Sequence, residues 1–134
     1  MRLLIDCDVL LDVCLARDPH FESSGAVIRW AQHHPGRAAV AWHTCSNLAY
    51  LTPGNLGRSF LRELVEFVVI PPVDTRSLRA ALELPLSDLE DAMQVAAAQN
   101  FSAVRIATRN LAHFSKSPVP AMHPKELITL LGVG

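Results

Sequence analysis

The sequence predicts an α/β protein built around a mainly parallel sheet. Short apolar runs of strand length alternate along the chain with longer segments in which apolar residues recur at helical spacing. One or two predicted helices separate each strand from the next, which is the pattern of parallel strands joined by crossover connections. The 134 residues suit one domain, and no internal repeat or long linker divides them. We therefore expect a single domain over residues 1–134.

The predicted strands are short, apolar and sharply bounded. The first ends at Asp6, and the third is rich in β-branched residues and stops at Pro71-Pro72. The second follows Pro35-Gly36, which closes the helix before it. In chain order, the strands and extended segments cover residues 2–5, 38–42, 67–70, 103–107 and 119–122.

Helical periodicity fills the segments between these strands. Apolar residues recur at helical spacing from Val9 to Cys14, and Pro19 ends that element because proline does not continue a helix. The predicted helices cover residues 9–14, 21–34, 44–51, 56–66, 74–82, 87–99 and 124–131, with a short helical turn at 110–114.

Composition and charge exclude several classes of protein. Hydrophobic residues make up 50% of the chain and charged residues 19%, which is typical of a globular protein rather than a disordered one. The formal net charge of -1 provides no overall cationic field, so a polyanionic partner would have to meet a local patch. All the cationic residues except Lys116 and Lys125 are arginines, whose planar guanidinium suits phosphate.

The sequence also argues against secretion and membrane insertion. The apolar run before Asp6 is too short for a signal peptide, and the longest uncharged stretch, residues 38–57, contains polar residues, proline and glycine. The cysteines, Cys7, Cys14 and Cys45, are odd in number and lack close pair spacing. We interpret them as small apolar residues in a reducing cytoplasm rather than as a disulfide or zinc framework.

The first acidic cluster follows the first strand. Asp6 ends an otherwise apolar strand, and ligand sites of open parallel sheets form beyond the C-terminal ends of the strands. A carboxylate in that setting needs a cation, which can be an arginine or a divalent metal. Asp8 has a structural interpretation as a helix cap, and Asp12 as a solvated helix residue. Asp6 is therefore the functional candidate of this cluster.

The second acidic cluster opens the helix predicted at residues 87–99. Ser87 and Glu90 have the spacing of a capping box, which would account for Glu90 without any chemistry, and Asp88 suits the positive helix end. Asp91 remains, and no charged residue follows it before Arg105, so we expect its carboxylate to point inward, with Asp88 on the same face.

Two further segments carry polar candidates. Thr108, Arg109 and Asn110 follow the strand predicted at 103–107, which places them at the same edge of the sheet as Asp6. Asn110 also suits the N-cap of the next turn, and Asn47 suits a hydrogen-bonded core amide.

Taken together, these segments resemble the PIN-domain family, which includes VapC-type ribonuclease toxins. The opening strand and helix resemble the family's first motif, where Asp-x-Asn is usual and this chain has Asp6-Cys7-Asp8. The other similar segments are the loop at residues 17–21, the third motif at 88–92, and the Thr-x-Asp/Asn-x-x-x-Phe motif at 107–114. The order and separation of these segments make the resemblance specific.

The resemblance implies a three-layer fold with helices on both faces of the sheet, and an acidic pocket that binds Mg²⁺ or Mn²⁺ and hydrolyses RNA phosphodiester bonds. By position, Asp6 and Asp91 are implied as the catalytic metal ligands, with Asp88, Asp8 and Asn110 completing the site. Thr108 and Asn47 occupy supporting or substituted motif positions. The resemblance also implies a homodimer and a small antitoxin partner.

The chain departs from the family pattern at two acidic positions. The second acidic position, commonly Glu, aligns with Asn47, and the fourth, commonly Asp, aligns with Asn110. An amide still offers a carbonyl oxygen to a cation, but the loss of two charges weakens the attraction. Asp8, where the family often has Asn, restores one charge, and we expect a single, loosely held metal.

Two alternatives stay open at this point. The first is a PIN-like fold whose pocket no longer cuts and that acts as a binding or regulatory module, which Asn47 and Asn110 favour. The second is a haloacid-dehalogenase-type phosphatase, because the Asp6-Cys7-Asp8 segment also resembles that family's opening motif, in which the first Asp is the nucleophile. If RNA is the substrate, we expect phosphate contacts from Arg17, Arg105 and Arg109, which lie near motif ends.

Overall fold

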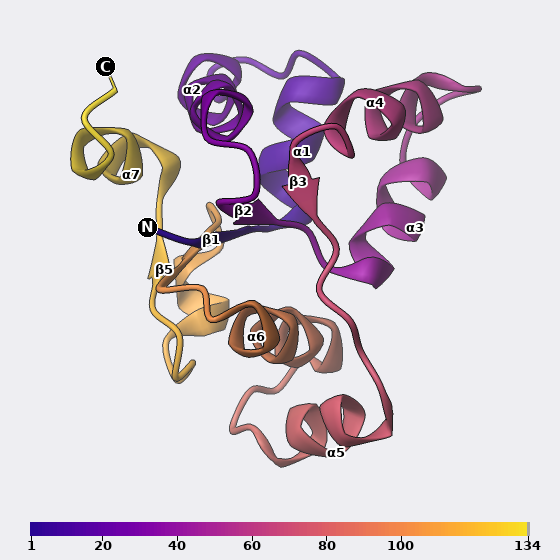
Figure 1. Ribbon diagram of the computed structural model, residues 1–134, viewed down its shortest axis with the longest axis vertical. Coiled ribbons are helices and arrows are strands. Elements are labelled where there is room, and N and C mark those ends of the chain that lie inside the picture. The colour runs from indigo at the N-terminus through magenta and orange to yellow at the C-terminus, as the bar shows by residue number, and fades with distance from the viewer. Residues whose placement is uncertain (134) are drawn as a thin grey trace.

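A five-stranded parallel sheet forms the centre of the protein. The computed structural model describes residues 1–133. The strands are β1 (Leu3–Ile5), β2 (Ala38–Ala39), β3 (Val68–Val69), β4 (Arg105–Ala107) and β5 (Ala121–Met122). They lie in the order β3-β2-β1-β4-β5, and all neighbours are parallel (Figure 1). The predicted parallel α/β class is confirmed, and β1 occupies the middle of the sheet.

Helices connect the strands in the predicted sequence order. The helices are α1 (Cys7–Cys14), α2 (Phe21–His33), α3 (Trp42–Tyr50), α4 (Leu56–Leu64), α5 (Thr75–Glu83), α6 (Leu89–Phe101) and α7 (Pro124–Leu130), with a 3-10 turn η1 (Leu111–Phe114). Among the residues described, no helix is long and apolar enough to cross a membrane.

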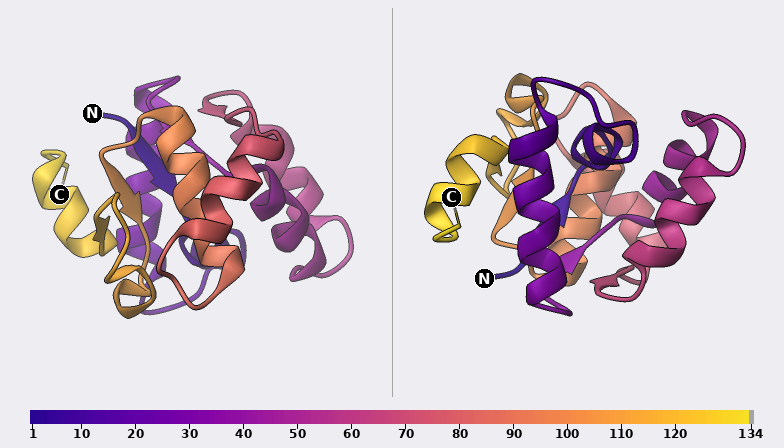
Figure 2. Two further views of the ribbon diagram at one scale, coloured as in Figure 1. Left: turned by 90° about the horizontal axis from the view of Figure 1, so that it is seen from below. Right: turned by 90° about the horizontal axis from the view of Figure 1, so that it is seen from above.

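The sheet is covered on both faces, because alternate residues of each strand point to opposite sides. Leu3 and Ile5 of β1 belong to a core that includes residues of α1, α2, α4 and α7. Leu4 belongs to a second core on the other face, with Val95 and Phe101 of α6. Figure 2 shows the two sides in turn, with α5 and α6 in one view and α1 and α2 in the other. Helices therefore cover both faces, as the family resemblance implied.

The strands are shorter than the sequence predicted. The predicted strand at 38–42 keeps only Ala38–Ala39, and Trp42 already begins α3. The extended segment predicted at 119–122 contributes β5, which pairs with β4 as the fifth strand. Hydropathy alone did not separate the last residues of a buried strand from the first turn of the next helix, because both are apolar.

Two predicted helix caps are wrong. Asp6, not Asp8, is the N-cap of α1, and its side chain accepts a hydrogen bond from the backbone N–H of Cys7. Asp88, not Ser87, is the N-cap of α6, and its Oδ1 accepts from the backbone N–H of Glu90 at 2.8 Å. A carboxylate at that position also benefits from the positive end of the helix. The Glu90 side chain is thereby free for other contacts.

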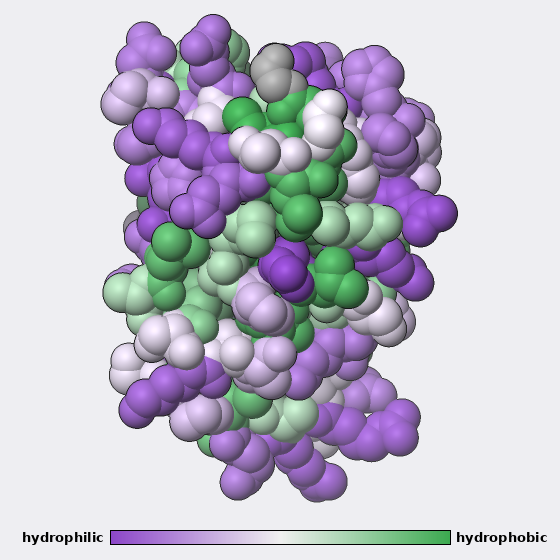
Figure 3. Space-filling view, turned by 90° about the vertical axis from the view of Figure 1, so that its left-hand side faces the viewer, coloured by the Kyte–Doolittle hydropathy of each residue, from purple (hydrophilic) through white to green (hydrophobic). Residues whose placement is uncertain are grey.

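The edge of the molecule near α7 and β5 carries both apolar and polar side chains. Figure 3 shows this face, where a band of apolar residues runs between strongly polar areas. Leu130 of α7 is half exposed, whereas Leu127 on the same helix is buried against the first core.

Candidate active site

The candidate site begins where β1 and β4 end. The two strands are parallel neighbours with Ile5 opposite Ala107, so the residues that follow them, Asp6 and Thr108, also lie side by side. The backbone N–H of Asp6 donates to the carbonyl of Ala107 at 2.9 Å, which extends the pairing to the first residue of the site. Asp6 therefore stands at the C-terminal edge of the sheet, as its position after an apolar strand predicted.

Three donors hold the Asp6 carboxylate. Oδ1 accepts from the backbone N–H of Cys7 at 2.7 Å and from the side-chain amide of Gln94 at 2.9 Å, while Oδ2 accepts from the hydroxyl of Thr108 at 2.8 Å. Asp6 is 5% exposed. Burial, together with the nearby Asp8 carboxylate, raises the pKa of Asp6 to about 7 despite these hydrogen bonds. A positive charge at this point would stabilise the ionised form.

The first turn of α6 brings further carboxylates to the same place. Oxygen atoms of Asp88, Glu90 and Asp91 lie within 4.8 Å of one another. Burial, and then the charges of Asp88 and Glu90, raise the pKa of Asp91 to about 6. His113 of η1 approaches Asp91, with Nδ1 at 3.3 Å from Oδ2. Asp91 is buried, so its carboxylate points inward as the apolar character of α6 predicted.

Asp6, Glu90 and Asp91 line one open pocket of about 370 Å³. It gathers most of the residues that the sequence singled out, although they come from four different parts of the chain. Its lining consists of Asp6, Cys7, Asp8, Leu11, Arg17, Asn47, Leu51, Glu90, Asp91, Arg109 and Asn110. Thr108 is fully buried and supports Asp6 from below the surface.

Two predicted site residues have other positions. Asp88 is exposed at the start of α6, and one of its oxygens is used by the helix cap, so it lies beside the pocket rather than in its lining. Arg105 begins β4 opposite Leu3, at the strand end far from Thr108, and its guanidinium donates to the carbonyl of Val104. The expectation that Arg105 lies near the pocket is therefore wrong, because a parallel strand has its first and last residues at opposite edges of the sheet.

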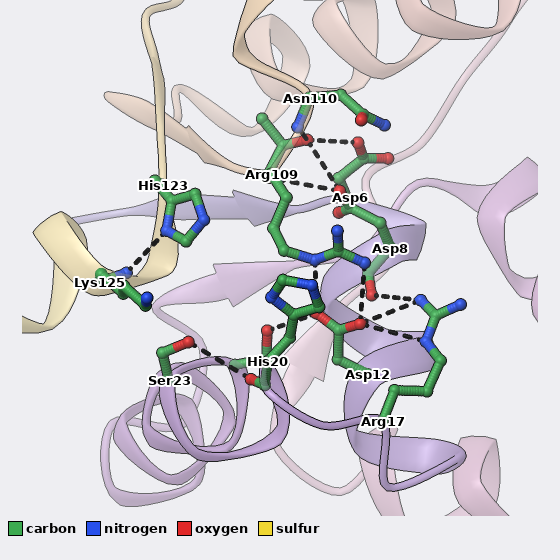
Figure 4. Close-up of polar contacts among 12 residues, drawn as sticks. Asp6, Asp8, Asp12, Arg17, His20, Ser23, Arg109, Asn110, His123 and Lys125 are labelled. Carbon is green, nitrogen blue, oxygen red and sulfur yellow. Dashed lines mark hydrogen bonds and ion pairs between the residues drawn. The ribbon is translucent and has the colours of Figure 1, made fainter.

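Asp12 is the largest departure from the sequence analysis. The solvated position expected for it is wrong, because the residue is fully buried in α1. Ser24 donates to it at 2.8 Å, Arg17 lies 3.0 Å from Oδ1, and Arg109 contacts both of its oxygens. Although burial opposes this effect, the bonds from Arg109 and Ser24 lower the pKa of Asp12. Figure 4 shows Arg109 and Arg17 converging on Asp12.

Asp8 lies between the acidic and basic groups. Its Oδ2 accepts from the backbone N–H of Arg109 at 2.9 Å and from Thr108 at 3.4 Å. Within the described chain, its Oδ1 is buried and has no hydrogen-bond partner. Burial raises the pKa of Asp8, as it does for Asp6.

The donor set fits a hard divalent cation. Mg²⁺ and Mn²⁺ take oxygen ligands, and carboxylates are the main ones that proteins supply. Here Asp6, Asp8 and Asp91 line one pocket, the pKa of each is raised, and one oxygen of Asp8 lacks a partner among residues 1–133. The amides of Asn47 and Asn110 face the same pocket and offer neutral oxygens.

Glu90 and Gln94 have parts in the site that were not predicted from the sequence. Glu90 lines the pocket, and its Oε1 is 3.1 Å from Nε2 of His43, an interaction that lowers the pKa of Glu90. Gln94 is fully buried and contacts Asp6. A polar residue among the apolar residues of this helix indicates an inward-facing side chain. That pattern predicted the orientation of Asp91, and it applies equally to Gln94.

Comparison with known families identifies the fold. The PIN domain model matches residues 2–112, which include the first motif, the loop at 17–21, the third motif and all but the last two residues of the motif at 107–114. This chain belongs to the PIN-domain family. Membership favours the PIN motif over the phosphatase motif for the Asp6-Cys7-Asp8 segment. No curated protein matches the sequence at a significant level.

Solved structures with the same PIN fold cover almost the whole chain. One is VapBC2 from Rickettsia felis bound to a DNA fragment from its promoter, with a TM-score of 0.70, 13% identity, and coverage of 92% of this chain and 98% of the other. A second is FitAcB from Neisseria gonorrhoeae, with a TM-score of 0.63, 15% identity, and coverage of 92% of this chain and 98% of the other. A third is a toxin–antitoxin complex from Klebsiella pneumoniae, with a TM-score of 0.63, 21% identity, and coverage of 91% of this chain and 97% of the other. At these identities, the likeness shows the fold.

Proposed function

We propose that the protein is a divalent-metal-dependent endoribonuclease and the toxin of a toxin–antitoxin pair. The observation that carries the proposal is the convergence of Asp6, from the end of β1, and Asp91, from α6, on one open pocket with Asp8. These residues are distant in sequence, and their mutual repulsion disfavours the arrangement unless a cation is present. The family supports a nuclease, and the neighbour described as a toxin–antitoxin complex supports the toxin assignment.

In this proposal, Asp6 and Asp91 are the catalytic ligands of one Mg²⁺ or Mn²⁺ ion. Asp8 and Asn110 complete its surroundings from the same pocket, and Asp88 adds charge from the rim. When bound, such an ion lowers the pKa of a water molecule and stabilises charge on the phosphate. Thr108 keeps Asp6 oriented toward the pocket by holding Oδ2.

The basic side of the pocket would receive the RNA phosphate. Arg17 and Arg109 both line it, and they share the single carboxylate of Asp12, so the three groups carry a net positive charge. The Arg17 side chain is the more exposed of the two, at 39%. We therefore assign the principal phosphate contact to Arg17 and a positioning role to Arg109.

We further propose a protein antitoxin, a homodimer and a cytoplasmic site of action. The antitoxin is supported by the neighbour from Klebsiella pneumoniae, which is described as a toxin–antitoxin complex. The homodimer rests on the family resemblance, and light scattering of the purified chain tests it. The cytoplasmic location follows from the proposed cellular RNA substrate, and the three cysteines are free, as expected in a reducing compartment.

One observation favours a second function. Asn47 and Asn110 line the pocket where the family commonly has acids, which reduces the charge available to a cation. A PIN fold that binds RNA or a protein without cutting would retain the pocket and the arginines.

Cleavage assays distinguish these functions. The purified chain is incubated with structured RNA in Mn²⁺, Mg²⁺ or EDTA, beside Asp6→Asn and the surface control Asp74→Asn. The nuclease predicts metal-dependent cleavage that Asp6→Asn abolishes and Asp74→Asn leaves unchanged. Cleavage that survives both EDTA and Asp6→Asn contradicts the metal mechanism. RNA binding without cleavage at any metal concentration supports the binding module.

A further inference from the structure

Gln94 is a fully buried amide at the centre of the candidate site. It belongs to α6, three residues after Asp91 and four after Glu90, so it lies on the same side of the helix one turn later. Its Nε2 lies 2.9 Å from Asp6 Oδ1, 2.8 Å from Thr44 Oγ1 and 3.3 Å from Glu90 Oε1. The reverse amide orientation would place a carbonyl oxygen against two carboxylates, so the donor end must face them.

Within the described part of the chain, this amide makes the only side-chain hydrogen bond between Asp6 and α6. The other donors to Asp6 are the N–H of Cys7 and the hydroxyl of Thr108, which come from α1 and from the end of β4. Neither of them connects Asp6 to Asp91. The relative position of the two carboxylates therefore depends on Gln94, which contacts one of them and shares a helix with the other.

The position is unfavourable for the fold by itself. Within residues 1–133, the carbonyl oxygen of Gln94 is buried without a hydrogen-bond partner. A buried polar atom without a partner opposes folding, and an apolar side chain of the same size would avoid that penalty. The hydroxyl oxygen of Thr44 in α3 accepts a second hydrogen bond from the same amide nitrogen at 2.8 Å. The presence of glutamine at position 94 is therefore better explained by a role in the candidate site than by a role in core packing.

We propose that Gln94 is a positioning residue that fixes the Asp6 carboxylate relative to Asp91, with Thr44 holding the Gln94 amide in place. This inference rests on the proposed function in that the two carboxylates share one cation. Residues that orient metal ligands typically change metal affinity or activity by about 10–100-fold when replaced. Loss of the Gln94 amide therefore weakens the cation site without removing any of its ligands.

The test compares four forms of the full chain: wild type, Gln94→Met, Thr44→Val and the control Gln99→Met. Methionine matches glutamine in size and lacks the amide. Gln99 lies exposed on the same helix. Crystals grown in EDTA report the orientation of the Asp6 carboxylate, calorimetric titration with Mn²⁺ reports affinity, and RNA cleavage gives kcat and KM.

In Gln94→Met, we expect the Asp6 carboxylate to rotate and Mn²⁺ affinity to fall by about 10-fold or more. With RNA contacts intact, kcat should fall while KM changes little. Thr44→Val should show a smaller change in the same direction, and Gln99→Met should match wild type. An Asp6 carboxylate that keeps its orientation in Gln94→Met, with Mn²⁺ affinity within about twofold of wild type, overturns the proposal.

The two proposals fail in different ways. A wild-type chain that neither binds Mn²⁺ nor cleaves RNA overturns the proposed function. The crystals grown in EDTA still decide the role of Gln94 in that case, because a carboxylate that rotates in Gln94→Met and Thr44→Val supports positioning, and one that stays in place in both contradicts it.

Discussion

The guanidinium of Arg109 holds both oxygens of Asp12, with Nε at 2.8 Å from Oδ2 and NH2 at 2.9 Å from Oδ1. These residues lie 97 positions apart, in the segment after β4 and in α1. The backbone N–H of Arg109 also donates to Asp8 at 2.9 Å. One residue thus fastens the end of β4 to the helix that follows β1.

Replacing Arg109 should destabilise the fold strongly. Arg109→Met leaves the fully buried Asp12 carboxylate with Arg17 and Ser24 alone, and breaking a buried ion pair from one side costs about 3 kcal/mol. Urea denaturation measures the change in the free energy of unfolding. As a control, Arg76→Met removes an exposed partner of Asp74 and should change the free energy of unfolding far less, because solvent screens this pair. If Arg109→Met and Arg76→Met lower the free energy of unfolding equally, the burial of Asp12 adds nothing to the stabilisation by the Arg109–Asp12 ion pair.

The stability of the metal-free protein should depend on pH through Asp6. Burial and the nearby Asp8 raise its folded-state pKa to about 7, from an ordinary value of 3.8. Between these values the folded state binds more protons than the unfolded state, so the free energy of unfolding falls as pH rises. Asp6→Asn cannot titrate, so its free energy of unfolding should lack this fall. The difference in the free energy of unfolding, Asp6→Asn minus wild type, should therefore be larger at pH 8 than at pH 4 by at least about 1.4 kcal/mol. Urea denaturation of both proteins in EDTA at the two pH values measures this difference. If the free energies of unfolding of wild type and Asp6→Asn change equally with pH, the raised pKa of Asp6 is contradicted.

Restoring an acid at position 47 should strengthen the cation site. Asn47 lines the pocket with Asp6 and Asp91, so Asn47→Asp adds a charged oxygen close to the site. We expect Mn²⁺ affinity to rise by about 10-fold, the equivalent of about 1.4 kcal/mol, with faster RNA cleavage. Calorimetric titration checks the affinity. Asn55→Asp, on an exposed loop, is the control and should change neither quantity. An unchanged affinity in Asn47→Asp would place that side chain outside the cation's reach.

RNA binding should weaken with salt in a way that depends on Arg17. If Arg17 contacts a phosphate, Arg17→Ala should reduce the slope of log affinity against log salt by about 1. Arg105→Ala is the matched control, because Arg105 lies at the opposite end of β4 from the pocket. Fluorescence anisotropy with Asp6→Asn as the background prevents cleavage during the measurement. Equal slopes for the two arginine variants would rule out a phosphate contact by Arg17.

Much of the fold could be predicted from local pattern. The apolar strands, the helical spacing between them and the proline stops gave the parallel α/β class and the order of the elements. The positions of Asp6 and Asp91 also followed from local features: one ends an apolar strand, and the other lies on an apolar helix. The spacing of apolar residues along a strand or helix is a local feature, so the sequence predicts which apolar face is buried.

The caps and strand ends could not be predicted in the same way. Asp6 and Asp8 are equally suitable caps by residue type, as are Ser87 and Asp88, and the choice depends on where the first helical turn begins. The extended segment near Met122 became a strand because β4 was available as a neighbour. In each case the local structure depends on contacts with another part of the chain, and not on the residues of the segment alone.

The sequence by itself determined which residues could be buried and which strand and helix would carry the two acids of the site. Only the tertiary structure decided how the polar groups pair: Gln94 with Asp6 across 88 positions, Arg109 with Asp12 across 97, and Thr108 with Asp6 across 102. Hydrogen bonds and ion pairs act over a few ångströms in space, whatever the separation along the chain. The sequence therefore did not reveal that Asp12 and Gln94 are buried, nor which partners they contact.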